Sequence, residues 1–143
     1  MIKPIIRDVM FLSQPSEKAT TADKQVIQDL LDTLNAHLDG CVGMAANMIG
    51  VRKRIIVVRM RPMSVAMVNP EIVSRSGEYD AEEGCLSLMG VRTCKRYRDI
   101  EVSYQDASFM TRRQKYSGWI AQIIQHEIDH CRSEEHTSEL QSH

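Results

Sequence analysis

Two histidines one helical turn apart, with a glutamate between them, are the residues of this chain best suited to chemistry. His126 and His130 lie four positions apart in the segment Gln125-His126-Glu127-Ile128-Asp129-His130. On a helix, residues at this spacing share one face, so both imidazoles can reach the same metal ion. Glu127 follows the first histidine, where a carboxylate can take the proton of a water molecule at the metal. The pattern therefore predicts metal-assisted hydrolysis.

A third protein ligand would separate a metal site from a solvated helix that carries two histidines by chance. Cys85 is the candidate, because the preceding Gly84 gives the backbone beside the thiol more conformational freedom. The surrounding segment, Glu82 to Ser87, is typical of a turn that presents a ligand. Two imidazoles and one thiolate leave a fourth position open, as in catalytic zinc sites, whereas structural zinc sites close all four positions with protein groups.

Three segments carry a resemblance to the peptide deformylase family. Glu83-Gly84-Cys85-Leu86-Ser87 and His126-Glu127-Ile128-Asp129-His130 match the second and third family motifs without a gap. The first motif, Gly-x-Gly-x-Ala-Ala-x-Gln, aligns with residues 41–48 and is partly kept, because Cys41 replaces the first glycine and Met48 the glutamine. The motifs stand in the family order and at plausible separations.

The resemblance implies a metal-dependent enzyme that removes the N-formyl group from the initiator methionine of nascent polypeptides and releases formate. It also implies that Cys85, His126 and His130 bind one divalent ion. Fe²⁺ is the usual ion of the family, and Zn²⁺, Ni²⁺ or Co²⁺ also suit a thiolate with two imidazoles. The expected partners are N-formylmethionyl peptides and, as an open question, the ribosome.

Further site residues carry over from the family motifs. Glu127 is the expected acid–base catalyst, which takes the water proton and passes it to the leaving amine. The backbone N–H of Leu86 is an expected donor to the developing oxyanion. Gly43 and Arg96 are expected to contact the substrate, although the run of basic residues leaves the arginine assignment open by two positions. Asp129 is expected to orient a ligand or to form a local ion pair.

Met48 is expected to weaken catalysis. The family glutamine at this position donates an N–H to the oxyanion, and a methionine side chain has none. The loss of one such donor typically lowers the rate by about 10²–10³-fold. Asn47 is a neighbouring amide that could replace the glutamine, but adjacent side chains point in different directions.

Three functional hypotheses follow from these residues. The first is an active deformylase. The second, consistent with Met48 and Cys41, is a deformylase homologue that binds metal with little or no activity. The third is a different metallohydrolase, such as a peptidase with the same helix motif. The Cys85 segment argues against the third, because typical peptidases of that motif take their third ligand from histidine or a carboxylate.

The composition narrows the class of protein. A chain of 143 residues suits one domain, and its net charge of -1 creates no broad field for nucleic acid or an anionic membrane. No apolar run has the length of a membrane span, and the amino end does not resemble a signal peptide, which predicts a cytoplasmic protein. The four irregularly spaced cysteines are expected to be reduced thiols.

The elements that must position the site follow the order helix, strands, helix. A capping box at Thr20–Asp23 and an apolar stripe predict an amphipathic helix over about 21–38, which Asp39-Gly40 ends. Segregated strands favour an α+β fold, with short antiparallel strands packed around a carboxyl-terminal ligand helix. The predicted strands lie at Ile55–Val58, Val65–Val68, Ile72–Val73, Val91–Cys94 and Ile100–Tyr104, with turns at Arg61-Pro62 and Asn69-Pro70.

The ligand helix carries an apolar stripe beside the two histidines. Ser117 is its predicted cap, and Trp119 and Ile123 fall on the same stripe as His126 and His130. These two apolar side chains fit the core, and they also fit the wall of an apolar substrate pocket beside the metal. The two interpretations do not exclude each other.

The last twelve residues differ from the rest of the chain. Residues 132–143 have no apolar period and resemble one reading frame of a common sequencing adapter. The family resemblance extends from the amino end to about Cys131. We therefore expect a deformylase-like domain over residues 1–131, truncated within its last helix, and a non-native tail over residues 132–143.

Overall fold

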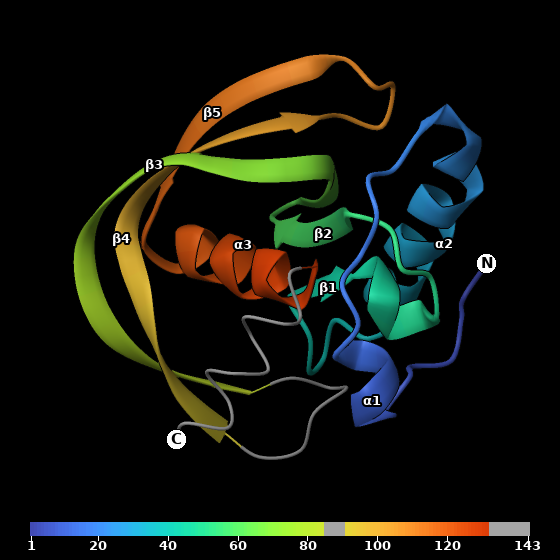
Figure 1. The fold of residues 1–143 in the computed structure, drawn as a ribbon, viewed down its shortest axis with the longest axis horizontal. Coiled ribbons are helices and arrows are strands. Elements are labelled where there is room, and N and C mark those ends of the chain that lie inside the picture. The colour runs from blue at the N-terminus through green and yellow to red at the C-terminus, as the bar shows by residue number, and fades with distance from the viewer. Residues whose placement is uncertain (85–90, 132–143) are drawn as a thin grey trace.

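Five antiparallel strands and a central helix form the frame of the molecule (Figure 1). The computed structural model describes residues 1–84 and 91–131. The elements of the described part are α1 (Val9–Leu12), the 3-10 turn η1 (Thr21–Asp23), α2 (Lys24–Asn35), β1 (Gly43–Ala45), the 3-10 turn η2 (Ala46–Ile49), β2 (Ile55–Met60), β3 (Met63–Gly84), β4 (Val91–Gln105), β5 (Thr111–Ser117) and α3 (Gly118–Cys131).

The sheet has the strand order β1-β2-β3-β4-β5, and every neighbouring pair is antiparallel. The strands β3 and β4, of 22 and 15 residues, form a long ribbon that curves around α3 (Figure 1). This is the predicted α+β fold with antiparallel strands around the ligand helix. Among the described helices, none is long and apolar enough to cross a membrane.

Two long strands replace several predicted short ones. The turn predicted at Asn69-Pro70 is wrong, because β3 continues through it with irregular register between Val68 and Glu71. Asn69 takes a positive φ of 51° there, and its side chain bonds to both backbone groups of Ala19. The bulge accommodates the proline without reversing the chain. Residues 91–94 and 100–104 likewise belong to one strand, β4.

The amino-terminal helix begins as predicted and ends early. Thr20 Oγ1 accepts from the Ala22 N–H at 3.3 Å, and Asp23 Oδ2 accepts from the Thr20 N–H at 2.8 Å. These two bonds are the predicted capping box. The regular helix ends at Asn35, and turns occupy residues 36–40, so the predicted extension to residue 38 is wrong.

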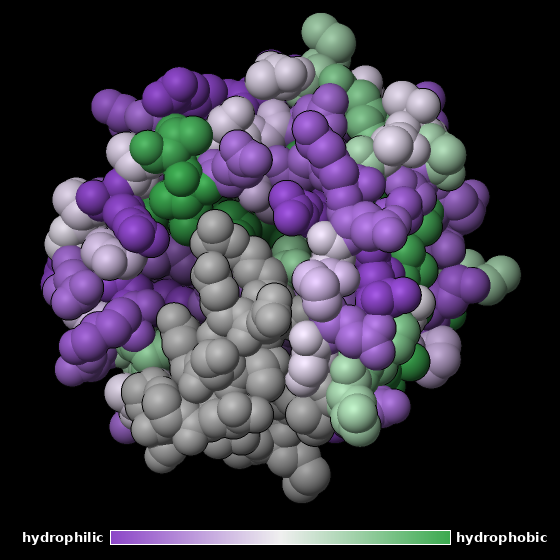
Figure 2. Space-filling view, in the orientation of Figure 1, coloured by the Kyte–Doolittle hydropathy of each residue, from purple (hydrophilic) through white to green (hydrophobic). Residues whose placement is uncertain are grey.

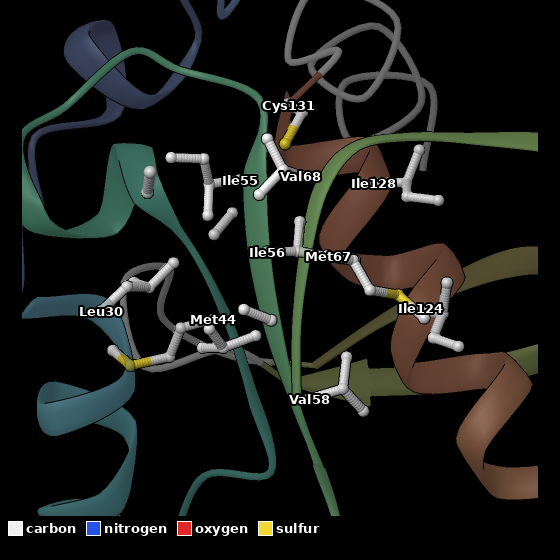
Figure 3. Close-up of a cluster of buried hydrophobic side chains, with 14 of the residues drawn as sticks. Leu30, Met44, Ile55, Ile56, Val58, Met67, Val68, Ile124, Ile128 and Cys131 are labelled. Atoms are coloured by element: carbon white, nitrogen blue, oxygen red, sulfur yellow. The ribbon is translucent and has the colours of Figure 1, made fainter. Parts of the chain in front are cut away.

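The core lies on both sides of the amino-terminal half of the sheet. The four residues of β2 from Ile55 to Val58 are fully buried, because α2 covers one face and α3 the other. Figure 3 shows Leu30 of α2 and Ile124 of α3 on opposite sides of these strands. The face drawn in Figure 2 is mostly hydrophilic, and one of its apolar patches lies beside the grey segments.

A single glycine turns the chain from β5 into the ligand helix. Ser117 is the last residue of β5, and Gly118 begins α3 with a φ of +62°. Glycine adopts this left-handed conformation without a steric penalty, so the strand passes directly into the helix. Ser117 therefore belongs to the strand, next to the helix that it was predicted to cap.

Candidate active site

The two histidines of α3 face each other as predicted. Their Nε2 atoms lie 3.3 Å apart, and their rings meet edge to face with centroids 4.9 Å apart. The side chain of His130 is buried, and that of His126 is 14% exposed. Together with Glu127 they form the one group of potential metal ligands found among the described residues, with ligand atoms within 4.8 Å of one another.

Glu83 orients the first histidine. His126 Nδ1 and Glu83 Oε1 lie 2.8 Å apart. Burial alone would raise the pKa of the Glu83 carboxyl, but hydrogen bonds from His126 and Arg96 outweigh it and hold that pKa well below its ordinary value. The ionised carboxylate accepts a hydrogen bond from the Nδ1–H group, which leaves the lone pair of His126 on Nε2, on the side of His130.

A buried arginine joins this carboxylate to the ligand helix. Arg96, whose side chain is 4% exposed, donates to Glu83 through Nε and Nη2 at 2.8 and 2.7 Å. Its Nη1 donates to Asp129 Oδ2 at 2.6 Å. The guanidinium therefore neutralises two carboxylates that would otherwise be costly to bury, and it fixes Asp129 beside the histidines.

Glu127 lies in a dry part of the site. Its side chain is 4% exposed, and Oε1 has no hydrogen-bond partner among the described residues. Burial raises the pKa of Glu127 to about 7. Gly43 of β1 lies against it, because a Cβ at this glycine would stand 3.1 Å from Glu127 Oε2 and 2.7 Å from Ile123 Cγ2. The motif glycine is thus required for close packing of β1 on α3.

The donor set fits a divalent metal ion. Tetrahedral coordination with bonds of about 2.0–2.1 Å separates two nitrogens by roughly 3.3–3.4 Å. The observed separation of the two Nε2 atoms is 3.3 Å. Glu127 Oε1 lies beside them without a hydrogen-bond partner among the described residues. A water molecule or an ion at this place would satisfy it, because buried polar atoms are rarely left without a partner.

Comparison with known proteins identifies the family. The family model for polypeptide deformylase matches residues 3–142. The peptide deformylase of Clostridium beijerinckii is 55% identical over 130 residues, which cover 91% of this chain and 96% of that protein.

The chain belongs to the polypeptide deformylase family.

Solved peptide deformylases agree with this assignment. The structure from Legionella pneumophila has a TM-score of 0.84 at 33% identity and covers 93% of this chain and 82% of its own. A structure from Acinetobacter baumannii with bound Met-Ala-Ser has a TM-score of 0.82 at 26% identity and covers 93% and 96%. Deformylases are metal-dependent hydrolases of N-formylmethionyl peptides, and this activity therefore belongs to the present chain.

Two of the deformylase motif residues expected in the site, Cys85 and Leu86, lie outside the described residues. None of the thiols that the structure describes joins the histidine group. Cys94 Sγ is 3.3 Å from Glu83 Oε1, and burial raises the pKa of the Cys94 and Cys131 thiols to about 12. These two cysteines are therefore protonated at neutral pH.

The first deformylase motif packs into the core beneath the site. Met48 is fully buried, and its Sδ accepts from the Ala45 N–H at 3.3 Å. Asn47 is also fully buried, and its Nδ2 donates to the His130 carbonyl oxygen at 2.9 Å. The Asn47 N–H₂ group is thus engaged with the end of the ligand helix, which disfavours its use as an oxyanion donor.

Arg96 and Trp119 lie in other surroundings than expected. The Arg96 guanidinium forms ion pairs with Glu83 and Asp129, and the predicted contact of Arg96 with the substrate stays a prediction. Trp119 is 60% exposed at the start of α3, so its interpretation as core is wrong, whereas Ile123 is buried as expected. The role of Trp119 as a pocket wall stays a prediction.

Sequence reasoning did not assign a role to Glu83 or Gln125. Both were visible as the residues that flank the metal-ligand candidates, two positions before Cys85 and one before His126. A carboxylate beside a ligand motif is a general signal for a partner of the histidine Nδ1–H. Glu83 lies 43 residues from His126 along the chain, so the sequence did not reveal that the two side chains are paired.

Proposed function

We propose that this deformylase holds one divalent ion through Cys85, His126 and His130 and uses Glu127 as its acid–base catalyst. The observation that carries this proposal is the pair of Nε2 atoms 3.3 Å apart beside the unpartnered, buried Glu127 Oε1. Cys85 follows Glu83 by two residues. Glu83 contacts His126, and two residues of extended backbone span about 7 Å, which supports Cys85 as the third ligand.

The metal supplies the nucleophile when it is bound, since a divalent ion lowers the pKa of a coordinated water toward roughly 7. The proton transfers are carried out by residues of the chain. Glu127 accepts the proton of the attacking water on Oε1 and delivers it to the amine nitrogen of methionine as the formyl carbon–nitrogen bond breaks. The low exposure of Glu127 excludes bulk water from this transfer.

The developing oxyanion needs donors that are in place before the charge forms. We assign the backbone N–H of Leu86 to this role. Met48 offers no N–H, and the Asn47 amide is bonded to His130, so one donor of the family pattern is missing. This supports a deformylase of modest rate, with a loss of roughly 10²–10³-fold relative to a chain that has glutamine at this position.

The substrate peptide is proposed to bind along β1. This strand is an edge of the sheet in the described part of the chain, and Gly43 places it against Ile123 and Glu127. An extended peptide can add to such an edge through backbone hydrogen bonds. The Met-Ala-Ser bound to the Acinetobacter baumannii deformylase supports a peptide of this length as the test substrate.

The nature of the ion is proposed from ligand chemistry. One thiolate with two imidazoles suits Fe²⁺, which is our assignment, and also Zn²⁺, Ni²⁺ or Co²⁺. Contact with the ribosome and a cytoplasmic location stay predictions.

Metal analysis and formate release together test the assignment. The parent chain, loaded with Fe²⁺ without oxygen or with Ni²⁺, is expected to bind one ion and to release formate from formyl-Met-Ala-Ser. Cys85→Ala is expected to lose the ion, and Cys94→Ala is the matched control that keeps it. An unchanged metal content in Cys85→Ala would refute the ligand assignment, and a metal-loaded parent that releases no formate would favour the inactive homologue.

A further inference from the structure

A buried side-chain amide binds the backbone of β4 next to the metal-ligand candidates. Gln125 is 3% exposed, and its Oε1 accepts from the Tyr97 N–H at 2.8 Å. Its Nε2 donates to the Tyr97 carbonyl at 2.8 Å and to the Ala121 carbonyl at 2.9 Å. The amide therefore satisfies both backbone groups of one strand residue at once.

The register of the sheet explains why Tyr97 needs such a partner. Strand β5 pairs with β4 only as far as Asp99, which lies opposite Ser117. In the same register Tyr97 would lie opposite residue 119, but the chain has already entered α3 at Gly118. The Gln125 amide replaces the β5 residue that would otherwise pair with Tyr97, since the amide presents one donor and one acceptor as a backbone residue does.

This contact sets the position of the first histidine. Gln125 immediately precedes His126, and Arg96, which precedes Tyr97, bonds to Asp129. Two adjacent residues of β4 thus hold α3 at positions 125 and 129, one helical turn apart. His126 lies within that turn, and small rotations of the helix would move its Nδ1 away from Glu83 Oε1, now 2.8 Å distant.

We propose that Gln125 is a positioning residue for the metal centre: its amide replaces a strand partner at Tyr97 and so sets the rotation of α3 that brings His126 to Glu83 and to His130. The proposal rests on the proposed metal site for its effect on metal affinity. The expected effect of Gln125 on the contact between His126 and Glu83 does not depend on the metal.

Gln125→Met tests the proposal, because methionine keeps the length of the side chain and loses both bonds to Tyr97. Gln122→Met is the matched control, since Gln122 lies on the same helix and, within the described part of the chain, its side chain accepts one hydrogen bond, from the Tyr79 hydroxyl at 3.2 Å. Leu30→Ala in α2 is a second control, which lowers stability away from the site. Gln125→Asn, a shorter amide, is the fallback variant where Gln125→Met does not fold.

Two readouts separate positioning from general stability. Competition with a chelator is expected to give a Co²⁺ dissociation constant about 10–100-fold higher in Gln125→Met than in the parent, as for other groups that orient metal ligands. The imidazole Nδ1–H resonance of His126 in the metal-free chain is expected to shift or disappear. Both controls should keep the parent affinity within about threefold and the parent resonance.

Other results would overturn the proposal. An unchanged affinity with an unchanged His126 resonance would show that Gln125 only stabilises the fold. Equal losses of affinity in Gln125→Met and Leu30→Ala would show the same. A parent chain that binds no Co²⁺ would refute the proposed metal site. The His126 resonance of the metal-free variants would still show whether Gln125 positions His126.

Discussion

The side-chain amide of Asn47 donates to the carbonyl oxygen of His130 at 2.9 Å and so joins the first motif to the end of the ligand helix. The last carbonyls of a helix have no partner within it. The next carbonyl, that of Cys131, accepts from the Ser16 N–H at 3.1 Å. Two segments from the amino-terminal part of the chain therefore hold the turn that carries the second histidine.

Asn47→Leu should destabilise the fold and weaken metal binding. The substitution leaves the His130 carbonyl without its buried donor, at a cost of about 1–3 kcal/mol in the free energy of unfolding. Denaturant unfolding and chelator competition measure the two effects. Asn35→Leu is the control, because Asn35 bonds to Ser64 at the surface and its loss should cost less than about 0.5 kcal/mol. Equal costs in the two variants would refute a special role for Asn47.

Arg96→Leu should lower the free energy of unfolding by about 3–5 kcal/mol, because the Glu83 and Asp129 carboxylates lose their shared counter-ion. Arg113→Leu removes an exposed ion pair with Glu101 and should cost less than about 1 kcal/mol. Urea unfolding of both variants gives the comparison. A small cost in Arg96→Leu together with a raised KM for the peptide would instead support the substrate contact predicted from the sequence.

Gly43→Ala should reduce turnover by displacing Glu127. The added Cβ would stand 2.7 Å from Ile123 Cγ2 and 3.1 Å from two atoms of Glu127, so the helix or the strand must move. We expect a loss of about 1–3 kcal/mol in stability and a lower kcat. Gly40→Ala is the control, since a Cβ there meets nothing within 4 Å. Parent kinetics in Gly43→Ala would show that the contact is not critical.

Met48→Gln should raise kcat by up to about 10²-fold if the glutamine amide reaches the oxyanion. The same change buries an amide in the core, so the melting temperature should fall. Met67→Gln, another fully buried methionine, should lower the melting temperature without any gain in rate. A metal-loaded Met48→Gln chain with unchanged kcat would mean that the missing donor does not limit the rate.

The sequence was most informative where the structure depends on local spacing. The pairing of His126 with His130 follows from helix geometry, and the capping box at Thr20 follows from a four-residue pattern. The bulge at Asn69 could not be predicted in this way, because its side chain bonds to Ala19, 50 residues away. The burial of Arg96 likewise depends on partners 13 and 33 residues distant. Such contacts between distant segments leave no periodic signal in the sequence.

The most direct test of the central claim compares Glu127→Gln with the parent chain. The amide keeps the size of the side chain but cannot accept the water proton. We predict that Glu127→Gln binds one metal ion with near-parent affinity and releases formate from formyl-Met-Ala-Ser at least about 10²-fold more slowly than the parent. A metal-loaded Glu127→Gln chain that releases formate within a few-fold of the parent rate would contradict the account, because another group would then be the base.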